Sequence, residues 1–126
     1  MANDEYDKLT EKIIGCAIKV HTTLGPGLLE NAYKECLFFE LCKAGFHVEK
    51  EKPLPLLYEG VNLDCGYRLD LLVDNSVVIE LKSVKKIEDI HLAQMLTYLK
   101  LGKYKVGLLI NFNVTALKDG IKRVSN

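Results

Sequence analysis

The chain has 126 residues, of which 48% are hydrophobic and 27% charged, and its formal net charge is zero. This length and composition fit one soluble globular domain with its own core, which we assign to residues 1–126. No apolar run reaches the roughly 18 residues that a membrane span needs, and the acidic, polar N-terminus resembles neither a secretory signal nor a transit peptide. We therefore expect a soluble, cytoplasmic protein that does not contact a membrane.

The distribution of charges indicates what kind of partner the protein could bind, and the spacing of the cysteines indicates whether they could bind a metal. Residues 1–81 carry 8 basic and 14 acidic side chains, whereas residues 82–126 carry 9 basic and 3 acidic ones. This asymmetry suggests one basic surface suited to a polyanion, although solvated lysines on a surface helix explain it equally well. The four cysteines lack C-x-x-C spacing and a neighbouring His cluster. They are therefore expected to be reduced structural thiols rather than zinc or iron–sulfur ligands.

Two helices are predicted at the start of the chain. Apolar residues recur at three- and four-residue steps over residues 5–24, and Gly25-Pro26-Gly27 ends this helix. A second amphipathic helix is expected over about residues 28–44. With Gly27 as its N-cap, Glu30 would occupy the third helical position, where the helix dipole favours an acid.

The rest of the chain alternates strands with one more helix. Strands are predicted over residues 46–51 and 53–58, and the second must be an edge or irregular strand because prolines interrupt it. The remaining elements are strands over 67–73 and 77–82, a helix over 88–101, a buried strand over 105–111, a short turn or helix over 114–118 and a short strand over 121–124. The order is roughly ααβββαβ, an α/β fold.

The two central strands form a hairpin whose register follows from their apolar residues. A three-residue loop, Asp74-Asn75-Ser76, pairs Val73 with Val77, Leu71 with Ile79 and Leu69 with Leu81 and so gives one apolar face. A two-residue loop would mix apolar and charged residues on both faces. We therefore expect the three-residue loop.

This register places Asp70 opposite Glu80, and Arg68 opposite Lys82. Two carboxylates that face each other across strands lie roughly 5 Å apart at Cβ and repel each other. A hard divalent cation with oxygen ligands would compensate for that repulsion. The simpler alternative is an exposed charge pair between Glu80 and Arg68, but this explains poorly why two acids meet in the middle of apolar strands.

Other polar residues are candidates by position. Glu30 shares a helical stripe with Tyr33, which a role at the sheet would require, although an acid near a helix N-terminus needs no function to explain it. Gln94 and Tyr98 are four residues apart on one helix face and could hold a phosphate, a carboxylate or a lysine; taken alone, a surface Gln and a boundary Tyr are favoured. His21 lies near a helix C-terminus, where a cation is favourable, and this is favoured over a metal role.

Taken together, these residues resemble the GxxExxY protein family, which is assigned to the PD-(D/E)XK nuclease superfamily. The G-x-x-E-x-x-Y pattern is formed by Gly27, Glu30 and Tyr33. The other stretches that resemble the family cover nearly the whole chain: residues 20–27, 67–73, 80–82, 93–99 and 107–112.

The resemblance implies a restriction-endonuclease-like core, a mixed central sheet flanked by helices. It places the acidic pair of the superfamily on Asp70 and Glu80, its lysine on Lys82 and its helical acid on Glu30. The Q-x-x-x-Y motif of RecB-like nucleases falls on Gln94 and Tyr98. The further candidates are Arg68 for binding or positioning nucleic acid, and His21 and Tyr33.

The resemblance further implies a metal-dependent nuclease that cleaves DNA in preference to RNA. Asp70, Glu80 and the backbone carbonyl of Leu81 would hold Mg²⁺ or Mn²⁺, with Glu30 at a second ion or a metal water, and Lys82 would orient the attacking water. The alternative is a catalytically silent module that binds nucleic acid or protein. The zero net charge and small size favour a domain that forms a homodimer or needs a protein partner. A small-molecule enzyme is disfavoured, because no phosphate loop, nucleophile elbow or Rossmann signature is present.

Overall fold

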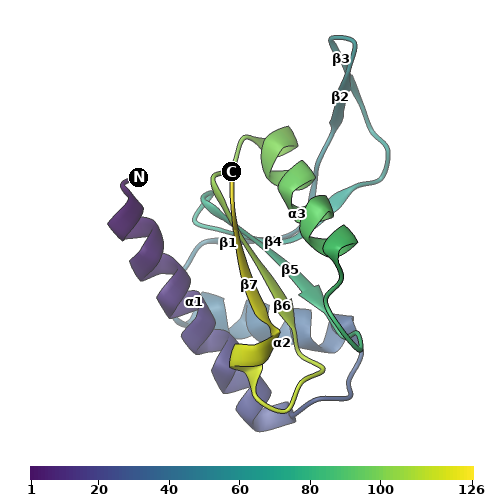
Figure 1. The fold of residues 1–126 in the computed structure, drawn as a ribbon. Coiled ribbons are helices and arrows are strands. Elements are labelled where there is room, and N and C mark those ends of the chain that lie inside the picture. Colours follow the sequence, from purple (N-terminus) through teal and green to yellow (C-terminus); the bar gives the residue numbers. More distant parts are fainter.

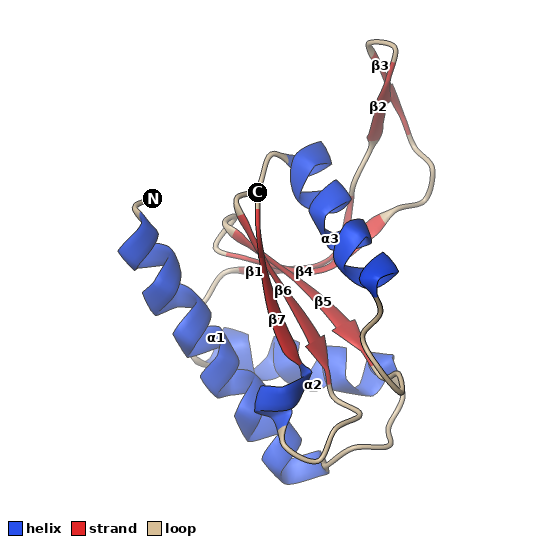
Figure 2. Ribbon diagram, viewed as in Figure 1, coloured by secondary structure: helices blue, strands red, loops and turns tan.

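The computed structural model describes residues 1–126 and shows a five-stranded mixed sheet with helices on both faces (Figure 1; Figure 2). The strand order is β1-β4-β5-β6-β7, with bounds β1 (Val48–Pro53), β4 (Arg68–Val73), β5 (Val77–Lys82), β6 (Val106–Asn111) and β7 (Ile121–Ser125). Strands β5 and β6 run parallel, and the other neighbours are antiparallel. The α/β fold with a mixed sheet flanked by helices is therefore confirmed.

The sheet separates two buried clusters, and helices cover each of them. Helices α1 (Asn3–Leu24) and α2 (Glu30–Lys43) cover one face of the sheet, where 17 buried residues form the larger cluster. Helix α3 (Asp89–Gly102) covers the other face, above a cluster of 8 buried residues. None of the helices has the length and apolar content that crossing a membrane requires.

Helix α2 begins two residues later than predicted. Its N-cap is Leu29, in an extended conformation, so Glu30 is the first helical residue and not the third. The expected cap, Gly27, has a φ of 101° and still belongs to the turn between the helices. The delay has a local cause, since the N–H of Leu28 donates to the hydroxyl of Tyr33 and keeps this segment out of the helix.

Residues 56–63 form a feature that the sequence prediction missed. Strands β2 (Leu56–Tyr58) and β3 (Val61–Leu63) pair with each other, form a separate two-stranded sheet and join at the expected turn, Glu59-Gly60. This hairpin projects from the body beyond one end of α3 (Figure 1). The strand predicted over 53–58 is thus divided, because Pro53 ends β1 and β2 begins only at Leu56.

The predicted three-residue loop between β4 and β5 is confirmed. Val73 pairs with Val77 and Leu71 with Ile79, and the regular pairing of the two strands ends there. The prediction for Leu69 is wrong, since Leu69 packs in the cluster beneath α3 whereas Leu71 packs beneath α1 and α2. The alternation of faces breaks at the intervening residue, opposite a left-handed Glu51 (φ 57°) in β1.

The C-terminal elements agree with prediction within a few residues. Strand β6 is buried along its whole length, as predicted, because its residues pack in the buried clusters on both faces of the sheet. The short turn or helix predicted over 114–118 is a 3-10 turn, η1 (Leu117–Gly120), which leads directly into the edge strand β7. The parallel pairing of β5 and β6 brings the C-terminal ends of both strands, Lys82 and Asn111, side by side.

Candidate active site

The candidate site lies where β4 and β5 stop pairing. The N–H of Leu81 donates to Oδ2 of Asp70 over 2.9 Å, and the N–H of Asp70 donates to Oε2 of Glu80 over 3.3 Å. Two carboxylates thus accept bonds from main-chain groups beyond the last pair of the ladder. The structure brings Asp70 and Glu80 together, as the hairpin register predicted.

The electrostatics of this pair are unusual for a sheet. Glu80 is 8% exposed, and burial raises its pKa to about 10, with the negative charge of Asp70 adding to the effect. No lysine or arginine forms an ion pair with either carboxylate. A buried acid beside a second acid is a costly arrangement, and it is the kind of donor set that a hard divalent cation stabilises.

The main chain adds a third oxygen. The N–H of Leu81 points toward β4, and in an extended strand the C=O of the same residue points to the same side. The pairing of β4 with β5 ends at Leu71 and Ile79, so this carbonyl lies beyond the last pair of that ladder. The donor chemistry here, two carboxylates and one carbonyl, therefore fits Mg²⁺ or Mn²⁺.

Lys82 lies at the end of β5 next to this pair. Its side chain is half-buried and forms no ion pair, and its positive charge opposes the rise in the pKa of Glu80. Arg68 does not lie opposite Lys82 as predicted, because it pairs with Pro53 of β1 and β4 has already left β5. Its guanidinium lies 3.5 Å from Asp64 and donates to the carbonyl of Tyr67.

The two polar residues of α3 are adjacent, as their spacing predicted. Nε2 of Gln94 donates to the hydroxyl of Tyr98 over 3.0 Å. Burial raises the pKa of Tyr98, and the nearby negative charge of Glu80 raises it further. The hydroxyl of Tyr98 therefore lies within electrostatic reach of the acid pair.

Glu30 lies apart from the acid pair. It is exposed, forms no hydrogen bond or ion pair, and no group of three or more His, Cys, Asp or Glu side chains is arranged to hold an ion. It lines an open hollow of about 630 Å³ together with Ser83 and Asn113. Since Ser83 directly follows Lys82 and its hydroxyl donates to the carbonyl of Leu28 over 2.6 Å, Glu30 borders the exit of β5.

His21 and Tyr33 have structural partners in this structure. Nε2–H of His21 donates to the carbonyl of Val114 over 2.8 Å. The hydroxyl of Tyr33 donates to the carbonyl of Gly25 over 2.6 Å, and its ring stacks on Phe112 with centroids 4.4 Å apart. Both residues thus fix the loops that border the hollow beside Glu30.

Asn111 is a residue that the sequence reasoning missed. It is 2% exposed, and its side-chain amide receives a bond from the N–H of Val84 over 3.1 Å and donates to the carbonyl of Val84 over 2.9 Å. This pair of bonds holds the chain as it leaves Lys82. The signal was available, since a polar residue ending a fully apolar strand must find buried partners.

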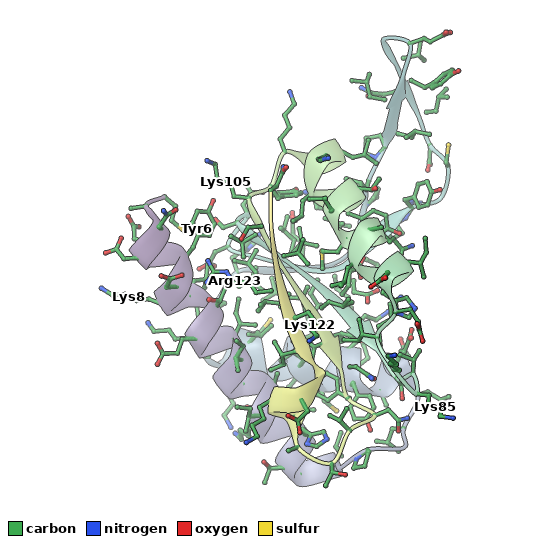
Figure 3. The ribbon with its side chains drawn as sticks, viewed as in Figure 1. Tyr6, Lys8, Lys85, Lys105, Lys122 and Arg123 are labelled. Atoms are coloured by element: carbon green, nitrogen blue, oxygen red, sulfur yellow. The ribbon has the colours of Figure 1, made fainter.

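The basic residues of the C-terminal third do not gather on one surface. Lys85 follows the end of β5, whereas Lys105 precedes the start of the parallel strand β6, so the two lie at opposite ends of the sheet (Figure 3). Arg123 of β7 is paired with Asp7 of α1 over 2.6 Å. Within this third of the chain, the basic residues closest in sequence to Glu80 are Lys82, Lys85 and Lys86, at and after the end of β5.

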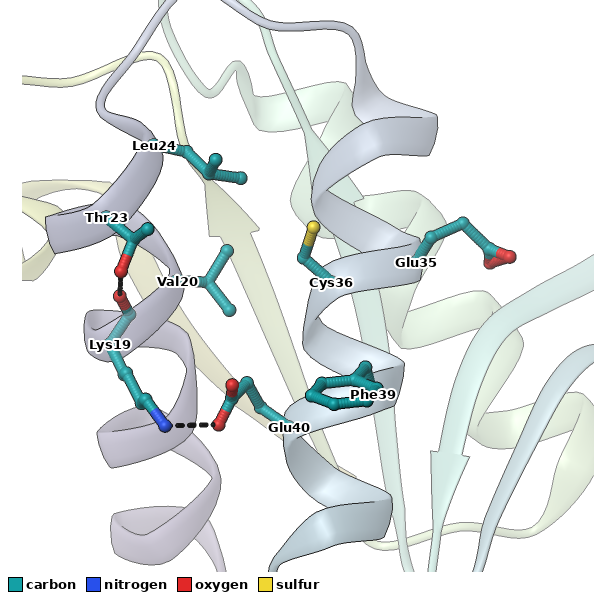
Figure 4. Close-up of a pocket in the computed structure, with 8 residues that line it drawn as sticks. All are labelled: Lys19, Val20, Thr23, Leu24, Glu35, Cys36, Phe39 and Glu40. Atoms are coloured by element: carbon teal, nitrogen blue, oxygen red, sulfur yellow. Dashed lines mark hydrogen bonds and ion pairs between the residues drawn. The ribbon is translucent and has the colours of Figure 1, made fainter.

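A separate cavity of about 270 Å³ lies between α1 and α2 (Figure 4). Val20, Cys36 and Phe39 supply its apolar lining, and an ion pair of 2.9 Å joins Lys19 to Glu40 at its edge. No residue of the acid pair or its surroundings lines this cavity. The four cysteines are all free; Cys16 and Cys36 are half-buried, whereas Cys42 and Cys65 are exposed.

Comparison with known protein families places this geometry in context. The model of the PD-(D/E)XK nuclease superfamily matches residues 7–124, nearly the whole chain. Comparison with curated proteins and with solved structures finds no match. The match spans the acid pair, the lysine that follows it and the Gln–Tyr pair of α3. The chain therefore belongs to the PD-(D/E)XK nuclease superfamily.

Proposed function

We propose that this domain is a minimal nuclease that hydrolyses phosphodiester bonds, in DNA rather than RNA, with Mg²⁺ or Mn²⁺. The observation that carries the proposal is the buried carboxyl of Glu80, which meets Asp70 with no cation paired to either. Membership of a nuclease superfamily supports the same reaction. Each carboxylate accepts a main-chain bond of the sheet, but a neutral Asn or Gln could accept the same bond without placing two acids side by side.

Asp70, Glu80 and the carbonyl of Leu81 would hold the ion. A divalent ion bound there would neutralise charge on the phosphate and lower the pKa of the attacking water. Binding requires the proton of Glu80 to leave, so occupancy should increase with pH. Glu30, which borders the exit of β5, would interact with a second ion or with its water.

Lys82 would act on the phosphate and the attacking water. Its ammonium has no carboxylate partner, so it is free to orient that water and to stabilise charge on the phosphate in the transition state. Gln94 and Tyr98 would position the phosphate backbone or the Lys82 side chain. Arg68, half-buried before Asp70, would contact the backbone of the nucleic acid.

Within the superfamily we assign the chain to the GxxExxY group. The structure supports this assignment as well as the sequence pattern does, because Gly27, Glu30 and Tyr33 each have a distinct place in the fold. The hydroxyl of Tyr33 donates to the carbonyl of Gly25. Gly27 has a φ of 101°, a conformation that favours glycine. Glu30 is the first residue of α2 and lies at the rim of the hollow.

The alternative is a catalytically silent interaction module. One observation favours it, namely the exposed apolar surface of the β2–β3 hairpin: Leu57, Tyr58 and Val61 are each more than half exposed. Surfaces of this kind often bind another protein or a second copy of the chain. One protein can carry both this surface and a nuclease centre. The two functions therefore differ in whether the acid pair binds metal and supports cleavage, and not in the hairpin.

The test is cleavage of labelled single- and double-stranded DNA and RNA in Mg²⁺ or Mn²⁺. Asp70→Asn and Lys82→Ala should abolish the activity. The matched controls are Asp119→Asn and Lys8→Ala, which change an exposed acid of η1 and an exposed lysine of α1, on the other face of the sheet from α3, and should cleave like the wild type. Equal cleavage by all variants would point to a contaminating nuclease. No cleavage together with no metal-induced rise in melting temperature would favour the interaction module.

A further inference from the structure

A pocket of about 340 Å³ lies between α3 and the base of the β2–β3 hairpin. Its walls are largely apolar and include Leu56, Tyr67, Ile90 and Tyr98, and the amide of Gln94 adds a polar edge. Neither a carboxylate nor a lysine lines it. Its volume lies at the lower end of the range for small-ligand pockets, roughly 300–1,000 Å³.

Two tyrosines that line the pocket connect it to the acid pair. Tyr67 lies just before β4 and three residues before Asp70, so one short segment carries both a wall of the pocket and a carboxylate of the acid pair. The rings of Tyr67 and Tyr98 lie 5.9 Å apart between centroids, inclined at 60°. Tyr98 in turn lies within electrostatic reach of Glu80.

The lining has the chemistry of a nucleobase site. Tyr67 is 41% exposed and Ile90 is 70% exposed, so each presents an apolar surface on which a flat ring can pack. Aromatic side chains bind unpaired bases in this way, with little dependence on sequence. Gln94 donates one N–H to Tyr98 and keeps its other N–H and its carbonyl oxygen free for the edge of a base.

We propose that this pocket binds one unpaired nucleobase of the substrate, so that the domain acts on single-stranded or locally unpaired nucleic acid. The inference rests on the proposed function, because the phosphate beside that base would lie at Asp70 and Glu80. A base inside a duplex is stacked on both faces and paired at its edge, and it cannot enter such a pocket without being extruded. Single strands and flaps therefore bind more tightly than intact duplex.

The experiment measures fluorescence anisotropy with three labelled probes of about 10 nucleotides, within the usual span of single-strand sites. The probes are a thymidine oligomer, an abasic strand of equal length and charge, and a blunt duplex. All binding is measured in Ca²⁺ in place of Mg²⁺ or Mn²⁺. A gel checks that each probe stays intact. The wild type should bind the thymidine oligomer about tenfold more tightly than the abasic strand, the gain expected from stacking one base.

Two variants locate that preference. Tyr67→Ala should bind the thymidine oligomer about tenfold more weakly while its affinity for the abasic strand stays unchanged, and Tyr67→Phe should restore binding because it keeps the ring. The matched control is Tyr58→Ala, which removes another exposed tyrosine, 61% exposed, from the hairpin tip and should bind like the wild type. Thermal melting of each variant confirms that it folds.

The outcomes separate the pocket from the nuclease proposal. Equal affinity of the wild type for the thymidine and abasic strands overturns the base pocket, whether or not the protein cleaves DNA. Equal losses in Tyr67→Ala and Tyr58→Ala overturn it too, as does a dimer that dissociates in Tyr67→Ala, which would assign this surface to a second copy. Base-dependent binding by a protein that never cleaves would support the pocket and overturn the nuclease proposal alone.

Discussion

Oδ2 of Asp70 accepts a hydrogen bond from the main-chain N–H of Leu81 over 2.9 Å, in a place where a strand carbonyl would otherwise accept it. A side chain of the candidate site therefore completes the hydrogen bonding of the sheet. We therefore expect changes to the acid pair to alter stability as well as the proposed activity, and the two effects can be measured separately.

We expect the metal-free protein to lose stability as pH rises. Burial, and then the negative charge of Asp70, raises the pKa of Glu80 from its ordinary 4.5 to about 10, so the folded state holds a proton that the unfolded state releases. Stability from this group is complete below pH 4.5 and declines as pH rises toward 10. Urea unfolding across this range with a chelator present should show the decline. Glu80→Gln should flatten it and raise the melting temperature above neutral pH by about 4 °C or more; an unchanged slope would contradict the assignment.

Divalent metal should stabilise the protein, and more so at higher pH. Ions that bind the folded state alone add about 2.7 kcal/mol at a hundredfold excess over Kd. Because the ion must displace the proton of Glu80, the rise in melting temperature with Mn²⁺ should increase with pH. Asp70→Asn should remove the rise, whereas Asp119→Asn should keep it. A rise that is the same in both variants would place the ion elsewhere.

Removing the hydroxyl of Tyr33 should destabilise the fold by about 1–3 kcal/mol, because the variant Tyr33→Phe leaves two main-chain groups without partners. These groups are the carbonyl of Gly25 and the N–H of Leu28. The ring remains to stack on Phe112, so the loss reports the hydrogen bonds alone. Chemical denaturation measures it. A loss below about 0.5 kcal/mol would mean that water replaces the hydroxyl.

Asn111→Ala should cost about 1–3 kcal/mol and also reduce cleavage at temperatures where the variant is fully folded. The reason is that the amide of Asn111 holds Val84, and with it the chain that leaves Lys82. Asn113→Ala is the matched control, since this exposed asparagine bonds the same carbonyl at 3.3 Å. The control should change stability by less than about 0.5 kcal/mol. Equal effects in the two variants would contradict a specific role for Asn111.

Sequence reasoning succeeded where a short-range pattern decides the structure. The alternation of apolar residues around Asp74-Asn75-Ser76 fixed the pairing of Val73 with Val77, and the acid pair followed from it. The four-residue spacing of Gln94 and Tyr98 likewise predicted their contact. Both results depend on the geometry of one hairpin or one helix.

It failed where distant segments decide. The face of Leu69 depends on the left-handed Glu51 in β1. The start of α2 is a different case, because a local bond from the N–H of Leu28 to the hydroxyl of Tyr33 outweighs the helical pattern there. Strand β3 was missed because it has only three residues, Val61–Leu63, too few to establish an alternating pattern, and all of them are exposed. The exposure of Glu30 depends on how the loop before α2 meets Ser83.

The separation of the β2–β3 hairpin from both cores has a consequence for how this domain can diversify. None of residues 56–63 belongs to either buried cluster or packs against one, and their strands pair only with each other. Insertions, deletions or exchanged sequences here would leave the sheet, its helices and the acid pair in place. The projecting segment can therefore change its sequence and its surface while the acid pair keeps its geometry.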